Sequence, residues 1–223
     1  MIAATGGMTA LPSRRKILVL GATGGTGQQV IARAVQQGYE VTALVRAPQR
    51  LTIRDDRVRV LVGSVTDDSH VLAEAVRGQS AVISTLGVGR SLRSGGLISR
   101  SLPRILRAME HEGVHRLIFT SAFGVGATRR DVPLGPRMLI GVLLQNIYRD
   151  KELGETALRA SALDWTLVYP TGLVDGPATG HCRVGERLPL SGFPRIARAD
   201  VADFLLNQID DPTYVRKGVL ISS

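Results

Sequence analysis

Cysteine is nearly absent from the sequence, and long apolar runs are missing altogether. The only cysteine, Cys182, excludes internal disulfides and metal clusters built from several thiols, and it is typical of a reducing cytoplasm. No run reaches the roughly 18 apolar residues of a membrane-spanning helix, and the first residues lack the charged start of a secretion signal. We therefore expect a soluble, cytoplasmic protein without a membrane partner, and a monomer because no separate apolar helix is evident.

Acidic residues are outnumbered, since 28 Lys and Arg stand against 19 Asp and Glu and give a formal net charge of +9. Basic domains of this kind often bind nucleic acid. Here the arginines are scattered, and aromatic residues, only 4% of the chain, do not interleave with a basic run. The pattern argues against nucleic acid. A basic surface equally suits a phosphate-bearing cofactor or a polyanionic small-molecule substrate.

The most informative stretch is residues 16–27, where an apolar run leads into the sequence Gly-Ala-Thr-Gly-Gly-Thr-Gly at 21–27 and a helical pattern follows. Glycines at such a turn allow a sharp bend, close approach of the backbone to a pyrophosphate, and tight packing of helix on strand. The helix N-terminus then offers free N–H groups to the phosphates. The spacing is GxxGxxG, and no Walker A motif occurs. The stretch predicts a dinucleotide-binding turn.

Runs of strand length alternate with helical patterns along the rest of the chain. We expect strands over residues 16–20, 39–45, 58–62, 81–86, 116–120, 164–169 and 218–222, and an irregular one near Arg183. Helical spacing follows the glycine turn and recurs over residues 71–76, 102–109, 138–160 and 200–209. The connections are too short for a second domain. The pattern predicts an α/β fold, a single-domain Rossmann-type doubly wound parallel sheet over residues 16–223 behind a disordered tail of residues 1–15.

Two arginines stand where the second strand of such a fold meets the adenosine ribose. An acidic residue there binds the ribose hydroxyls of NAD, whereas this chain has Arg46, with Arg50 shortly after it. A guanidinium matches the geometry of a 2′-phosphate, which a carboxylate would repel. The sequence therefore favours NADP(H) as the cofactor.

Candidate chemistry gathers after the fifth expected strand and on the following long helix. Ser121 lies at the carboxyl edge of the sheet, where a substrate meets the nicotinamide, and no GxSxG elbow surrounds it. Tyr148 and Lys151 are three residues apart, whereas the usual tyrosine–lysine pair is spaced by four. One position turns a helical side chain by about 100°, so we expect Tyr148 to serve packing and Lys151 to line the cofactor pocket.

Residues 111–115 match the zinc-binding pattern HExxH. The pattern needs both histidines on one helical face, whereas Gly113 is placed to end the helix and His115 to open the next strand. We therefore expect surface histidines and no metal site.

Five stretches, taken in order, resemble the atypical short-chain dehydrogenases/reductases, and within them the biliverdin-IXβ reductase or flavin reductase branch: residues 21–27, 45–46, 120–123, 164–166 and 198–202. The resemblance spans nearly everything from Lys16 onwards. It implies an enzyme in which NADPH delivers hydride to a flavin or a linear tetrapyrrole, with no metal. It also implies that Ser121 is the active-site serine and that Phe123 faces the substrate.

The residues expected to bind the cofactor combine the glycine turn, the arginine site and positions implied by the resemblance. They are Gly21, Thr23, Gly24, Gly25, Thr26, Gly27, Arg46, Arg50, Ser64, Val65, Leu86, Gly87, Lys151, Pro170 and Thr171. The chain departs from the family in three of them, because Ser64 replaces a common acidic residue, and Lys151 and Thr171 replace other polar residues. Two alternatives stay open: a non-catalytic NADP(H)-sensing protein of the NmrA-like type, and a sugar or quinone oxidoreductase.

Overall fold

The structure, a computed structural model, describes residues 15–67, 69–89, 91, 94–132 and 144–223. The strands of its main sheet are β1 (Lys16–Leu20), β2 (Glu40–Val45), β3 (Val58–Val62), β4 (Ala81–Ser84), β5 (Arg116–Thr120), β6 (Asp164–Pro170), β8 (Arg183–Gly185) and β10 (Lys217–Ser222). The α-helices are α1 (Gly25–Gln36), α2 (Ser69–Val76), α3 (Leu97–His111), α5 (Gln145–Ala160) and α6 (Arg198–Asn207), and two short 3-10 helices are η1 (Pro48–Arg50) and η2 (Gly126–Asp131). Two further strands, β7 (Gly172–Val174) and β9 (Arg195–Ala197), form a separate pair.

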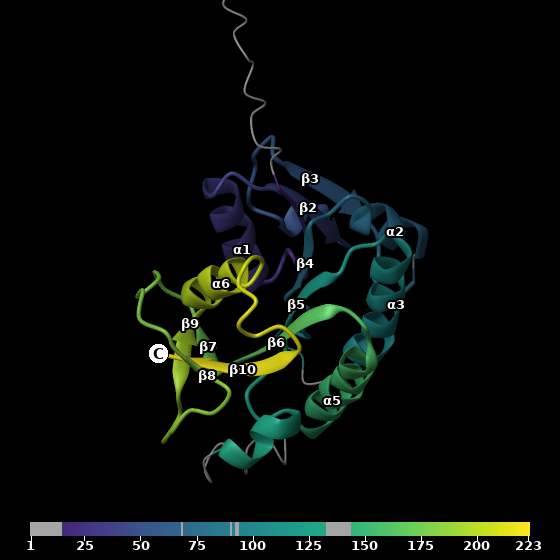
Figure 1. The fold of residues 1–223 in the computed structure, drawn as a ribbon. Coiled ribbons are helices and arrows are strands. Elements are labelled where there is room, and N and C mark those ends of the chain that lie inside the picture. Colours follow the sequence, from purple (N-terminus) through teal and green to yellow (C-terminus); the bar gives the residue numbers. More distant parts are fainter. Residues whose placement is uncertain (1–14, 68, 90, 92–93, 133–143) are drawn as a thin grey trace, which may run out of the picture.

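The main sheet has the strand order β3-β2-β1-β4-β5-β6-β10-β8, and its pairs are parallel from β3 through β10 (Figure 1). The predicted doubly wound Rossmann-type fold is therefore confirmed. Its last strand, β8, runs antiparallel to β10 because the chain reaches it through a loop after β7 and without a crossover helix. The sequence indicated a short strand near Arg183 but neither its direction nor the β7–β9 pair.

Each face of the sheet has its own apolar core. Along β1, Leu18 and Leu20 belong to one buried cluster, and Ile17 and Val19 belong to the other. Helices α2, α3 and α5 cover the first face, and α1 and α6 cover the second, as Figure 1 shows. Strands buried on both sides read as continuous apolar runs, which is why the runs in the sequence located them.

Helices α3 and α5 are joined closely at the end that faces the site. A Cβ built on Gly154 of α5 would lie 2.6 Å from Ile98 Cγ2 of α3, so only glycine permits this approach. Asp150 of α5 accepts hydrogen bonds from the backbone N–H groups of Ile98 at 3.0 Å and Ser99 at 2.9 Å. Because the residue that caps α3 is Gly96, which offers no side chain, Asp150 supplies the cap from the neighbouring helix.

Several element ends differ from the sequence prediction. Strand β4 stops at Ser84, two residues before the predicted end, and β6 includes Pro170, which pairs with Ile221 of β10. Helix α6 begins at Arg198, before the predicted residue. Three predicted segments lie wholly or partly outside the described residues. They are the tail except for Arg15, the start of the long helix at residues 138–143, and residues 90, 92 and 93 of the loop.

Candidate cofactor and active site

The glycine turn links β1 to α1 and has the geometry of a phosphate cradle. Gly21 has φ +78°, which favours glycine, and its carbonyl accepts a hydrogen bond from the Gly24 N–H at 2.9 Å. A Cβ on Gly27 would lie 2.3 Å from the Gly21 carbonyl oxygen, so helix and turn touch there. Gly24 and Gly25 are exposed at the start of α1, and no side chain caps that helix. The first N–H groups of α1 are therefore open to an anion.

Arg46 and Arg50 lie together beyond the end of β2. Arg46 directly follows the strand, and Arg50 ends the short helix η1. Both side chains are exposed, and neither guanidinium has an ion-pair partner within the part of the chain that the structure describes. Two guanidinium groups without an acidic partner in the described part of the chain have N–H donors suited to a phosphate.

The segments after β3 and β4 flank the cradle, because backbone hydrogen bonds continue beyond the strands. The Gly63 N–H donates to the Val45 carbonyl at 2.9 Å, which brings Ser64 and Val65 beside the end of β2. The Thr85 N–H donates to the Leu20 carbonyl at 2.9 Å, which places Leu86 and Gly87 beside the turn. The Ser64 hydroxyl donates to Asp67 at 2.9 Å, so an acidic side chain still stands at this end of the site.

Ser121 belongs to a buried cluster of polar side chains that the sequence did not reveal. Its hydroxyl donates to Glu155 Oε1 at 2.6 Å, and the Tyr169 hydroxyl donates to Glu155 Oε2 at 2.7 Å. Glu155 is only 2% exposed, and Arg159 approaches it at 3.6 Å. Burial, with the negative charge of Glu155 beside it, raises the pKa of Tyr169, so this phenol stays protonated. The carboxylate therefore holds two hydroxyls from the ends of neighbouring strands.

Lys151 lies one helical turn before Glu155 on the same buried face of α5. Its side chain is buried, and it makes no hydrogen bond or ion pair to any of the described residues. Burial lowers the pKa of Lys151 to about 8, and the carboxylates of Glu155 and Asp150 only partly offset this effect. An ammonium group held without a partner can donate to a bound molecule.

The Tyr148 hydroxyl does not join the Ser121 cluster and makes a backbone contact instead. Its hydroxyl donates to the backbone carbonyl of Phe123 at 3.0 Å, and burial raises its pKa to about 12. The residue four before Lys151, where the usual tyrosine would stand, is the buried Ile147. The described cluster around Lys151 thus holds no tyrosine in the usual place of the proton donor.

Backbone and hydroxyl contacts join the segments that hold the remaining predicted site residues. Phe123 is buried, and its N–H donates to the Pro170 carbonyl at 3.1 Å. The Thr171 hydroxyl donates to the Ser222 hydroxyl at 3.2 Å, which ties the end of β6 to the end of β10. The structure therefore places Ser121, Phe123, Pro170 and Thr171 at one edge of the sheet.

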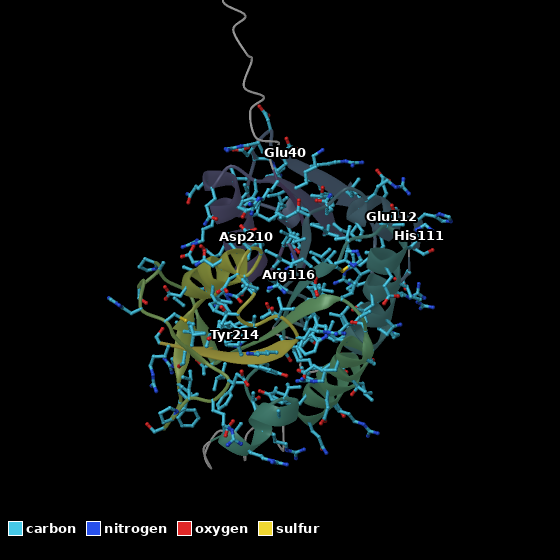
Figure 2. The ribbon with its side chains drawn as sticks, in the orientation of Figure 1. Glu40, His111, Glu112, Arg116, Asp210 and Tyr214 are labelled. Atoms are coloured by element: carbon cyan, nitrogen blue, oxygen red, sulfur yellow. The ribbon has the colours of Figure 1, made fainter. Side chains whose placement is uncertain are left out.

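The histidines of the HExxH pattern do not share a helical face. Helix α3 ends at His111, Gly113 has φ +68°, and His115 is an exposed residue just before β5. Figure 2 shows His111 and Glu112 on the outside of the molecule, and Glu112 is bound by Arg77 at 2.9 Å. Within the described residues, no group of three or more His, Cys, Asp or Glu side chains could hold a metal ion. Nor does any described helix have the length and apolar character needed to cross a bilayer.

Comparison with known proteins identifies the class. Residues 21–212 match the model of the NAD(P)H-binding family, and the chain belongs to that family. An uncharacterised chloroplastic protein of Arabidopsis thaliana is 26% identical over 174 residues, and this chain spans 62% of its length.

Two solved structures share the fold closely. ChuY, an anaerobilin reductase from Escherichia coli O157:H7, is 26% identical with a TM-score of 0.77, covering 92% of this chain and 96% of its own. A short-chain dehydrogenase/reductase from Veillonella parvula, solved in complex with NADP, has a TM-score of 0.80 at 20% identity, covering 94% of each chain. The chain is therefore an NAD(P)H-binding protein of an oxidoreductase family, similar to atypical short-chain dehydrogenases/reductases.

Proposed function

We propose that the protein is an NADPH-dependent reductase that transfers hydride to a flavin or to a linear tetrapyrrole. The observation that carries the proposal is the Ser121 cluster, with a buried ammonium and a buried carboxylate but Ile147 in place of the usual tyrosine acid. An unactivated ketone needs a strong acid in the transition state, whereas an electron-poor conjugated acceptor takes up hydride without one. The similarity to ChuY supports a tetrapyrrole among the acceptors.

The residues fit the cofactor because no side chain caps α1 and the two residues at its start, Gly24 and Gly25, are exposed glycines, so a phosphate can approach the backbone closely there. The N–H groups at the start of α1 would bind the pyrophosphate, and Arg46 with Arg50 would bind the 2′-phosphate. When bound, the nicotinamide supplies hydride, that is, two electrons and one proton. Because only NADPH carries a 2′-phosphate, the proposal includes a preference of the enzyme for NADPH over NADH.

Ser121 and Lys151 would orient what lies beside the nicotinamide. The proton of the Ser121 hydroxyl is already committed to Glu155, so its oxygen is left to accept a hydrogen bond from an N–H or O–H of the bound molecule. Lys151 would donate to an oxygen or ring nitrogen and stabilise negative charge there. The second proton that the reduced acceptor takes up would come from solvent.

The test measures the loss of NADPH absorbance under anaerobic conditions with FMN, FAD or biliverdin as the acceptor. We expect turnover with at least one acceptor and little without any. Tight binding of NADP with no turnover of any acceptor would refute the reductase proposal and favour the cofactor-sensing alternative. Turnover of a sugar nucleotide or a quinone alone would favour the other alternative.

A further inference from the structure

Arg198 lies across the start of the cofactor helix, although it comes from the far end of the chain. It is the first residue of α6, directly after β9. A Cβ built on Gly25, the first residue of α1, would lie 2.8 Å from Arg198 Cδ and 2.9 Å from its Nε. Because Gly25 has no side chain, the Arg198 side chain can lie against the start of α1, beside the glycine turn.

The guanidinium of Arg198 has one acidic partner and spare donors. Its Nη1 donates to Asp175 Oδ1 at 2.8 Å, and among the described residues no other acceptor takes its remaining N–H groups. The Arg198 side chain is 27% exposed, whereas the Asp175 side chain, just after β7, is 91% exposed. The arginine is fixed by its surroundings, and the carboxylate is a surface group that solvent can accommodate.

We propose that Arg198 binds the cofactor pyrophosphate and that Asp175 is its exchangeable counter-ion in the cofactor-free protein. A carboxylate and a phosphate compete for the same N–H donors of a guanidinium, and their negative charges repel. Asp175 therefore weakens cofactor binding, and it offers the arginine a partner when the cofactor leaves. The inference rests on the NAD(P)H-binding family and on the cradle, and it is independent of the electron acceptor.

The competing explanation is a purely structural role, in which the ion pair only ties the loop after β7 to α6. Both roles predict an effect of removing Arg198, but they differ for Asp175. A structural tie predicts that loss of Asp175 lowers stability and leaves cofactor affinity alone. A counter-ion predicts that loss of Asp175 tightens binding, and only when Arg198 is present.

The experiment titrates NADP⁺ and NADPH, without any acceptor, into the wild type, Asp175→Asn, Arg198→Met and the double variant at low salt. Glu186→Gln is the matched control, because Glu186 is also exposed and also paired, with Lys217 at 3.6 Å. We expect Arg198→Met to raise Kd about tenfold or more, since charge-assisted hydrogen bonds are lost, and Asp175→Asn to lower Kd about threefold. In the Arg198→Met background, Asp175→Asn should change nothing, and Glu186→Gln should leave Kd unaltered.

An unchanged or raised Kd in Asp175→Asn would overturn the proposal, as would the same tightening in Glu186→Gln, which would reveal only a general effect of net charge. If Arg198→Met fails to fold, Arg198→Lys takes its place, both alone and combined with Asp175→Asn. The exposed Asp175 can be replaced in either background. Since no acceptor is present, failure here leaves the reductase proposal standing. Equally, absence of flavin turnover leaves the titration result untouched.

Discussion

Replacing Lys151 with methionine should make the protein more stable at neutral pH. Lys151 is 8% exposed and has no hydrogen-bonding partner among the described residues, so its ammonium loses much of its hydration on folding and gains no hydrogen bond from those residues. Among the described residues, the charged groups that act on it are Glu155 and Asp150 on its own helix. Glu155 is in turn shared with the hydroxyls of Ser121 from β5 and Tyr169 from β6. Methionine has a similar length and no charge to desolvate.

The pKa of Lys151 gives the magnitude and the sign. Burial lowers it from 10.5 to about 8, and at roughly 1.4 kcal/mol per unit the charged form costs about 3 kcal/mol of folding free energy. The unfolded chain binds more protons between these two values, so the stability of the wild type rises from pH 8 toward pH 10.5. Below pH 8 the whole cost is present. Methionine removes it, and we expect a gain of about 1–3 kcal/mol at pH 7.

Urea unfolding of the wild type and Lys151→Met at pH 7, 8, 9 and 10 measures this difference. Other groups titrate in the same range, such as Cys182, whose pKa burial raises to about 11, but they are common to both proteins and cancel. The advantage of the variant should shrink as the pH rises. If the free energies of unfolding of the two proteins run parallel with pH, or if the variant is less stable than the wild type at pH 7, the reasoning is wrong. Interactions in the folded protein then offset the lost hydration of the ammonium.

Three further substitutions test the site. Arg46→Ala should lower the ratio of kcat/KM for NADPH to that for NADH about tenfold, since the 2′-phosphate loses its guanidinium, and an unchanged ratio removes Arg46 from the phosphate site. Ser121→Ala should reduce kcat of NADPH oxidation more than it weakens NADPH binding in a fluorescence titration, whereas equal losses would make Ser121 a cofactor ligand only. Glu155→Gln leaves one buried hydroxyl without its acceptor, so the free energy of unfolding in urea should fall by about 1–3 kcal/mol; an unaltered midpoint would contradict that account.

Local features made the geometry of the cofactor half of the candidate site predictable. The glycine turn needs only a strand, a bend and a helix start that are neighbours in the sequence, and Arg46 follows directly from the end of β2. Buried parallel strands also have continuous apolar sequences, so the order of strands and helices could be predicted. The sequence could not fix the direction of β8, because loops of that length permit either direction.

Long-range contacts made the other half unpredictable. Glu155 meets Ser121 across 34 residues only because α5 packs beside the ends of β5 and β6. Arg198 reaches Gly25 because α1 and α6 cover the same face of the sheet, as Figure 1 shows. The one local signal was the pair Lys151 and Glu155, two charged residues at helical spacing on a face whose other members include Ile147 and Leu158. Charges on a buried face indicate a site more directly than any spacing rule.

The burial of Lys151 argues that the Ser121 cluster has a function beyond packing. Glu155 is satisfied by two hydroxyls, and none of the described residues forms an ion pair or hydrogen bond with Lys151, so within that part of the chain the ammonium adds no bond that stabilises the fold. A protein that needed only a core at this position would gain stability from an apolar side chain. A cation that weakens the fold and still stands one helical turn from Glu155, the carboxylate that holds Ser121, is explained by a bound molecule that completes its hydrogen bonds.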